Sequence, residues 1–324
     1  MTDALLEVED LNVWFDLPNG GTLHAVRGVT FSVAAGTRLG MVGESGCGKT
    51  TTVLALMGLL PPTASVSGRI VLEGVDVLKG GEQTIAPHRW KDIAMVFQGA
   101  MNAFDPVKRI GEQIAEPMEL HGKATGREAT SRVGELLDTV GIPPERAKSY
   151  PHELSGGMRQ RAAIAMALAC TPRILLADEP TTALDVMVQA QILQLLTYLS
   201  DELGLALVFV THDLPIVAQT CTHAAVMYAG KIVEQGPTDA LYHETRHPYT
   251  RLLWAATPDL ESHDVVVSIP GVPPRLDAEL HGCPFAPRCD RAESRCASER
   301  PELRPVGDGH TSACHFASSL EVVR

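Results

Sequence analysis

The chain has 324 residues, 45% of them apolar and 20% charged, which suffices for one large domain with an appendage or for two domains. It carries 27 basic and 39 acidic residues, a formal net charge of −12, and this balance argues against nucleic acid as the main partner. Residues 1–7 lack the basic stretch and apolar core of a signal peptide, and no run of about 18 apolar residues occurs. We therefore expect a cytosolic chain that reaches a membrane only through a partner.

The first elements read as strands. Residues 4–15 and 29–34 are rich in β-formers and alternate between apolar and polar side chains, and a turn pattern at 16–21 lies between them. A further short strand is expected at 68–74, where glycines flank an apolar run. Together these segments predict an antiparallel sheet in the N-terminal part of the chain.

Residues 43–50 read Gly-x-x-x-x-Gly-Lys-Thr between an apolar run at 38–42 and a helical pattern at 51–58. Glycines let successive backbone N–H groups turn towards phosphate oxygens, and the start of a helix adds positive potential. The strand–loop–helix context favours a phosphate-binding loop over an ordinary glycine-rich turn, and threonine at 51 excludes a dinucleotide fingerprint. Lys49 is expected to reach the β- and γ-phosphates of a nucleotide, and the Thr50 hydroxyl to bind Mg²⁺. The residues assigned to the nucleotide are Gly43, Glu44, Ser45, Gly46, Cys47, Gly48, Lys49, Thr50 and Thr51.

Short apolar runs and helical patterns alternate through the rest of the first two thirds of the chain. This alternation predicts a mainly parallel sheet covered by helices, with a helical insertion at about 100–170. Strands are expected at 92–97, 174–177, 205–210, 224–228 and 231–234, the last two as a hairpin, and helices at 128–140 and 188–203.

Four polar residues stand at the ends of predicted strands. Asp178 is placed to hold the Mg²⁺ shell, and Glu179 to activate or position a water in line with the γ-phosphate. His212 is a candidate to bind the γ-phosphate and orient that water, and Gln98 to contact Mg²⁺ or the water. The competing interpretations are a surface Asp–Glu pair and a structural histidine.

A second candidate phosphate-binding feature follows the helical insertion. Residues 154–161 read Leu-Ser-Gly-Gly-Met-Arg-Gln-Arg, and Ser155 is a suitable N-cap for the helix that follows. Residues 182–185, Thr-Ala-Leu-Asp, come shortly after the Asp178–Glu179 pair.

The order and spacing of these motifs resemble those of ATP-binding-cassette ATPases over residues 1 to about 235, with Met158 in place of the commoner glutamine as the one departure. The resemblance implies a phosphate-loop NTPase fold: a RecA-like core with a mainly parallel sheet, an N-terminal antiparallel β subdomain and a helical subdomain at about 100–170. It also implies a head-to-tail pair of cassettes in which Ser155, Gly156 and Gly157 face the ATP of the opposing one. Asp185 is counted with these nucleotide-site residues.

Two further assignments follow from the same resemblance. In such ATPases an aromatic ring from the first strands often stacks on the adenine, and Phe15 is the first candidate, with Trp14 second. Either ring can instead belong to the core. Residues 98–111 resemble the surface that receives a helix of the membrane subunit in importers, so we expect coupling to the membrane subunit there.

After Gly236 prolines become frequent, and we predict one domain at 1–235 and a C-terminal extension at 236–324. Residues 247–253, His-Pro-Tyr-Thr-Arg-Leu-Leu, and 282–289, Gly-Cys-Pro-Phe-Ala-Pro-Arg-Cys, resemble segments of dipeptide and oligopeptide import ATPases. Related nickel importers share part of this pattern.

Four of the seven cysteines crowd the extension, at positions 283, 289, 296 and 314. In a reducing compartment such a cluster favours metal binding over disulfides, but its spacing is neither that of a zinc ribbon nor that of a bacterial ferredoxin. The spacing thus leaves the metal open. In some members of the resembled family four such cysteines hold a [4Fe–4S] cluster, which implies this cofactor for Cys283, Cys289, Cys296 and Cys314. Zinc and metal-free thiols are the alternatives.

The resulting hypothesis is an ATPase that uses ATP and Mg²⁺ to power import of dipeptides or oligopeptides. The expected partners are a second cassette, identical or paralogous, two transmembrane permeases and an extracytoplasmic peptide-binding protein, with this chain peripheral on the cytoplasmic face of the cell membrane. The alternatives are the same ATPase role in an importer of nickel or another small solute, and a soluble cassette ATPase. Nothing resembling a long coiled coil or a second cassette supports the soluble class.

Overall fold

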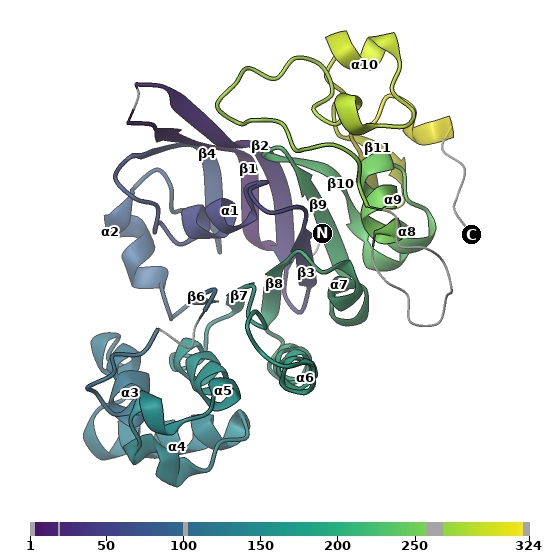
Figure 1. The fold of residues 1–324 in the computed structure, drawn as a ribbon. Coiled ribbons are helices and arrows are strands. Elements are labelled where there is room, and N and C mark those ends of the chain that lie inside the picture. Colours follow the sequence, from purple (N-terminus) through teal and green to yellow (C-terminus); the bar gives the residue numbers. More distant parts are fainter. Residues whose placement is uncertain (1–3, 19, 100–102, 257–267, 320–324) are drawn as a thin grey trace. The chain divides into compact units, whose positions relative to one another are not determined.

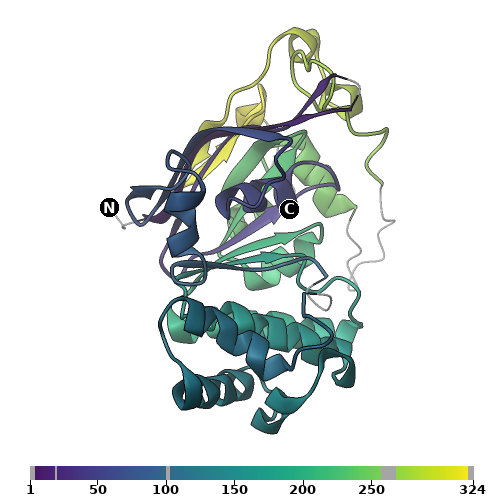
Figure 2. The same ribbon diagram turned by 90° about the vertical axis from the view of Figure 1, so that its left-hand side faces the viewer.

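The structure is a computed structural model and describes residues 4–18, 20–99, 103–256 and 268–319. The chain divides into two compact units, each built from separate stretches of sequence. The phosphate-loop unit comprises residues 6–33, 37–78 and 209–324, and the helical unit comprises residues 1–5, 34–36 and 79–208. Figures 1 and 2 show the elements of both units in two views related by a quarter turn.

The phosphate-loop unit contains a four-stranded sheet with the order β2-β1-β4-β5. Strand β1 pairs antiparallel with β4, and β4 pairs antiparallel with β5, as the alternating apolar positions of this region predict. The bounds of these strands are Ala4–Asp16 for β1, Thr22–Ala34 for β2, Ala64–Leu72 for β4 and Val75–Asp76 for β5.

The same unit also carries the strand that precedes the phosphate loop. Strand β3 (Arg38–Val42) pairs in parallel with β9 (His223–Tyr228), and the loop after β3 leads into helix α1 (Lys49–Leu56). Strand β10 (Lys231–Pro237) completes the predicted hairpin with β9. Helix α7 (Leu214–Thr220) connects β8 (Ala206–Thr211) to β9. The predicted strand–loop–helix context of residues 43–50 is therefore confirmed.

The C-terminal segment, defined here as residues 236–324, adds strands to the sheet that contains β3, β9 and β10. Strand β12 (His310–Ser312) pairs antiparallel with β10, and β11 (Arg304–Gly307) pairs with β12, so residues on both sides of the predicted boundary at 235 share one sheet. The helices of the segment, in green to yellow in Figure 1, are α8 (Thr238–His243), α9 (Pro248–Ala255), α10 (Ser294–Ser298) and short 3₁₀ turns at Ala286–Arg288 and Ala317–Ser319.

The helical unit holds strands β6 (Ile93–Val96) and β7 (Ile174–Asp178), which pair in parallel and are fully buried. Helices α3, α4 and α5 lie together in both views and form the predicted helical insertion. The described helices of the helical unit are α2 (Glu82–Ile85), α3 (Ile110–Leu120), α4 (Gly126–Thr139), α5 (Gly156–Ala167) and α6 (Val186–Leu203), with 3₁₀ turns at Ala86–His88, Pro144–Lys148 and Pro151–Glu153.

Local sequence explains where several of these helices begin and end. The apolar stripe of α4 buries Val133, Leu136 and Leu137, as its spacing predicts. Helix α6 ends at Gly204, which adopts a left-handed conformation with φ 62°. None of the helices in the described ranges combines the length and apolar character needed to cross a membrane. Residues 100–102 of the predicted coupling surface lie outside the described residues.

Candidate functional site

The phosphate loop wraps around its own lysine. The Lys49 ammonium donates hydrogen bonds to the backbone carbonyls of Gly43 at 2.6 Å and Glu44 at 3.1 Å. The residue is only 6% exposed, so the charge is held inside the loop. Thr50 is exposed in the first turn of α1, where the helix dipole favours an anion. Phosphate binding by Lys49 and Mg²⁺ binding by Thr50 stay predictions.

Two glycines of the loop have no room for a side chain. Gly48 has φ 106°, and a Cβ there would lie 2.6 Å from the Ala25 carbonyl oxygen. At Gly43 the added carbon would lie 2.2 Å from the Met227 carbonyl oxygen. The glycines of the motif thus bring the loop against neighbouring backbone.

The remaining loop residues differ in exposure. Ser45 and Gly46 are exposed and Thr51 is half-buried, whereas Cys47 is 5% exposed. Burial raises the pKa of the Cys47 thiol above its usual value, although the nearby Lys49 charge opposes the shift. The thiolate is the reactive form, so a raised pKa lowers the reactivity of Cys47. We therefore interpret Cys47 as a packed core residue of the loop.

Glu179 follows β7 directly and is held by two side chains of its own unit. Gln98 donates from Nε2 to Glu179 Oε2 at 2.9 Å, and Thr182 donates from Oγ1 to the same oxygen at 3.0 Å. The backbone of Glu179 is left-handed, with φ 43°, a conformation that is costly for a residue with a Cβ and is found most often at functional sites. Asp178, in contrast, is the buried last residue of β7.

The structure therefore brings together two residues that the sequence assigned to the same water, Gln98 and Glu179. Sequence reasoning gave no role to Thr182, although it stands three residues after Glu179 in the turn that leaves β7. That spacing is the signal by which a turn-forming hydroxyl beside the carboxylate could have been found.

Two residues assigned to the nucleotide cap helices. Ser155 is the N-cap of α5, and its Oγ accepts a hydrogen bond from Met158 N at 3.3 Å. Asp185 is the N-cap of α6, and its Oδ1 accepts from Val188 N at 2.9 Å. A Cβ at Gly157 would lie 2.7 Å from Val188 Cγ1. Gly157 therefore lets α5 begin close to the first turn of α6. The neighbouring Gly156 is half-buried.

The two aromatic candidates on β1 have different surroundings. The Trp14 ring stacks on His24, with ring centres 4.6 Å apart and planes 21° apart. Phe15 is half-buried and, as the next residue along the strand, projects from the opposite face of the sheet. Trp14 therefore already has a stacking partner within the chain, which favours Phe15 as the ring for the adenine.

The predicted nucleotide residues are divided between the units. The phosphate loop, Phe15 and the exposed His212, which follows β8, belong to the phosphate-loop unit. The residues at 98, 155–157, 178–179 and 185 belong to the helical unit. Their assembly into one site stays a prediction.

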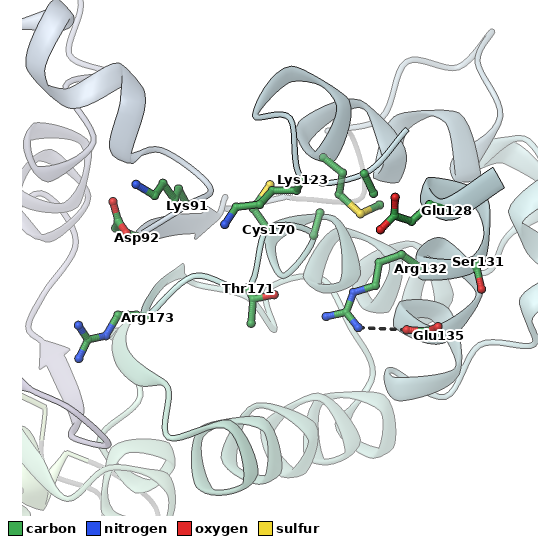
Figure 3. A pocket seen from close by; sticks show the side chains of 13 residues that line it. Lys91, Asp92, Lys123, Glu128, Ser131, Arg132, Glu135, Cys170, Thr171 and Arg173 are labelled. Atoms are coloured by element: carbon green, nitrogen blue, oxygen red, sulfur yellow. Dashed lines mark hydrogen bonds and ion pairs between the residues drawn. The ribbon is translucent and has the colours of Figure 1, made fainter. Parts of the chain in front are cut away.

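A pocket of about 560 Å³ in the helical unit contains none of these residues. Figure 3 shows charged side chains around it, among them Lys123, Arg173 and the ion pair between Arg132 and Glu135 at 3.0 Å. Several of its lining residues come from α4. The pocket is thus a feature of the helical unit, and none of the predicted ATP residues lines it.

The four cysteines of the C-terminal segment line one small cavity, of about 20 Å³, together with His247 and Phe285. All four are free thiols, and the cavity has room for a group of about the size of one water. Backbone N–H groups of Arg291 and Phe316 donate to the sulfurs of Cys289 at 3.4 Å and Cys314 at 3.5 Å. Within the described residues, however, no three histidine, cysteine or acidic side chains are arranged to hold a metal ion. The thiols are thus suited to a soft metal in kind, but the described side chains do not form a metal site in this structure.

Comparison with known families and proteins gives the same assignment as the motifs. Residues 26–182 match the ABC transporter family, and residues 233–296 match the C-terminal region of oligopeptide/dipeptide transporters. A probable peptide ABC transporter ATP-binding protein of Sinorhizobium fredii is 46% identical, over 96% of this chain and 95% of the relative. The oligopeptide transport ATP-binding protein OppD of Escherichia coli is 44% identical, over 96% and 93%. The dipeptide transport ATP-binding protein DppD of Bacillus subtilis is 42% identical, over 96% and 94%.

A solved structure supports the fold. The dimeric ATP-binding cassette MJ0796, bound to ADP and phosphate, is 28% identical and superposes with a TM-score of 0.64, covering 72% of this chain and 98% of that one. The cassette fold predicted from the motifs is therefore confirmed, as is ATP hydrolysis as its activity. The chain belongs to the ATP-binding proteins of the oligopeptide/dipeptide ABC transporter family.

Proposed function

We propose that this chain hydrolyses ATP to power import of dipeptides or oligopeptides across the cell membrane, from its cytoplasmic face. The observation that carries the proposal is the match to peptide-transport ATP-binding proteins along nearly the whole chain, including the C-terminal region typical of oligopeptide/dipeptide transporters. A cassette match alone would support ATP hydrolysis without indicating the transported solute.

In this proposal the phosphate loop binds the nucleotide. Lys49 would exchange the carbonyls of Gly43 and Glu44 for phosphate oxygens, and the N–H groups at the start of α1 would face the same anion. Thr50 and Asp178 supply oxygen ligands suited to Mg²⁺, with Gln98 as a further candidate. When bound, the ion would neutralise charge that develops on the phosphates.

Glu179 is proposed as the residue that accepts a proton from the attacking water. Its Oε2 accepts hydrogen bonds from Gln98 and Thr182, which hold the carboxylate in place. His212 would orient the water or bind the γ-phosphate. Phe15 would stack on the adenine.

A complete site is proposed to need a second cassette, identical or paralogous. The N-terminus of α5, with Ser155 as its cap, would face the γ-phosphate bound by the opposing chain. The dimeric state of the MJ0796 cassette supports this arrangement. The other proposed partners are two permeases, contacted near residues 98–111, and an extracytoplasmic peptide-binding protein.

Reconstitution tests the transported solute. Vesicles that contain this chain with its permeases and binding protein should accumulate labelled dipeptides or oligopeptides only when MgATP is present on the side of the cassette. Uptake should not occur with ADP. Accumulation of nickel or another small solute in place of peptide would contradict the proposal while leaving the ATPase assignment in place.

We also propose that Cys283, Cys289, Cys296 and Cys314 bind a metal centre, a [4Fe–4S] cluster before zinc. The support is the convergence of four free thiols on one cavity and the presence of backbone donors beside two sulfurs. The centre would link four points of a segment that has little regular structure.

Elemental analysis of the anaerobically purified full chain tests this site. We expect about four iron and four acid-labile sulfide per chain, with visible absorbance, as a cluster on four thiolates requires. The Cys289→Ser variant should lose most of this iron, whereas Cys170→Ser, at a buried cysteine outside the segment, should keep it. Zinc alone, or no metal in the wild-type chain, would overturn the cluster assignment.

A further inference from the structure

Glu44, the first variable residue of the phosphate loop, forms an ion pair with an arginine of the C-terminal segment. The guanidinium of Arg288 donates to Glu44 Oε2 at 2.6 Å and to Oε1 at 2.8 Å. The Arg288 side chain is 4% exposed and that of Glu44 is 25% exposed. The pair is therefore bidentate and largely shielded from water, a geometry in which charge-assisted hydrogen bonds are strong and directional.

Arg288 is itself held on several sides. Its Nε donates to the Pro270 carbonyl at 2.7 Å, and one terminal nitrogen reaches the Tyr228 hydroxyl at 3.3 Å. The guanidinium carbon also lies 5.8 Å from the ring centre of Tyr228 and 5.9 Å from that of Phe285. An arginine fixed in this way presents its paired donors to Glu44 in one orientation.

The backbone of Glu44 is occupied as well. Its N–H donates to the hydroxyl of Tyr249, a fully buried residue of α9, at 2.9 Å. Its carbonyl accepts from the Lys49 ammonium at 3.1 Å. The N–H and the carboxylate are thus both engaged by the C-terminal segment, while the carbonyl is engaged by the lysine expected to bind phosphate. Glu44 therefore links the segment to that lysine.

We propose that the C-terminal segment sets the conformation of the phosphate loop through Glu44, with Arg288 as the positioning residue. Arg288 contacts neither phosphate nor Mg²⁺ in this proposal; it fixes the carbonyl and N–H directions of Glu44, and with them the place of Lys49. The inference rests on the proposed assignment of residues 43–50 as the ATP loop. It also gives Glu44 a structural role in place of the direct nucleotide contact expected from the motif.

Arg288 is also adjacent in sequence to one of the cysteines that line the small cavity. Arg288 immediately precedes Cys289 and ends the 3₁₀ turn Ala286–Arg288, and Cys283 and Cys289 on either side of that turn both line the cavity. A change in the position of these thiols would therefore move the backbone that carries the guanidinium.

The test measures ATP affinity and ATP turnover separately on the full chain. Arg288→Gln and Glu44→Gln should each weaken ATP binding by about tenfold, within the range usual for coupling between distinct sites. The turnover rate at saturating ATP should change less than twofold. The double variant should be no weaker than either single variant, because both remove the same contact. Arg288→Lys keeps the charge but not the paired donors, so its ATP affinity should lie between those of the wild type and Arg288→Gln.

The matched control is Arg275→Gln. Arg275 forms a bidentate pair with Asp277, at 3.0 and 2.6 Å, in the same segment, but the pair is between near neighbours in sequence and lies on the surface. ATP affinity should not change in this variant. Should Arg288→Gln fail to fold, Glu44→Gln and Arg288→Lys carry the test.

The outcomes separate this inference from the proposed site. Wild-type affinity in Arg288→Gln or Glu44→Gln, or effects that simply add in the double variant, would overturn the positioning role. Loss of turnover and thermal stability without a change in affinity would do the same. A wild-type chain that does not bind ATP at all would instead contradict the assignment of the loop.

Discussion

Replacing Glu179 with glutamine is expected to slow ATP hydrolysis by about a hundredfold or more while leaving ATP binding intact, because a positioned base contributes factors of this size. The amide has the shape of the carboxylate and still accepts a hydrogen bond from Gln98 or Thr182 through its carbonyl oxygen. It cannot take a proton from water. The change therefore removes the proposed chemistry with little change in packing.

Single-turnover hydrolysis and equilibrium ATP binding, measured on the same preparation, check this result. Glu135→Gln is a suitable control, since Glu135 is an exposed carboxylate of the same unit that pairs with Arg132 at 3.0 Å. Its hydrolysis rate should match that of the wild type. Turnover in Glu179→Gln within a fewfold of the wild type would exclude Glu179 as the base.

Replacing Lys49 with alanine should weaken ATP binding by roughly ten- to a hundredfold, the range expected for losing a hydrogen bond to a charged group. The ammonium lies between two carbonyls of the loop, 2.6 and 3.1 Å away, so the substitution removes both the phosphate ligand and a contact that closes the loop. Hydrolysis at low ATP should fall in parallel.

Nucleotide titration followed by fluorescence or calorimetry measures the change. Lys108→Ala provides the comparison, because Lys108 is an exposed lysine 3.9 Å from Glu116 and belongs to the helical unit. Its ATP affinity should be unchanged. Undiminished affinity in Lys49→Ala would refute the interpretation of residues 43–50 as the ATP loop.

Much of the fold could be predicted because local patterns determine it. Glycines at 43 and 48 occur where a side chain would meet a backbone carbonyl oxygen, so the motif reflects a lack of space for any larger residue at these positions. The apolar run at 174–177 is a buried strand, and the helix expected at 188–203 is found at Val186–Leu203. These features depend on residues close together in sequence.

The contacts that join distant parts of the chain could not be predicted in the same way. Glu44 and Arg288 are 244 positions apart, and neither is unusual in its local sequence. Cysteine spacing indicated a shared site, and the four residues do line one cavity, but spacing carries no information on how far apart the sulfurs lie. Phe15 was preferred to Trp14 from the sequence, but only the structure shows that Trp14 stacks on His24.

The Arg288–Glu44 pair has a consequence for how such chains can diverge. A loop residue that would otherwise be free to vary is tied to a position near the far end of the chain, so replacing either partner alone leaves a shielded charge unmatched. Viable lineages should therefore change the two positions together or keep both. A hybrid made by joining this cassette to the C-terminal segment of a distant relative should work best when the donor supplies the partner that Glu44 requires.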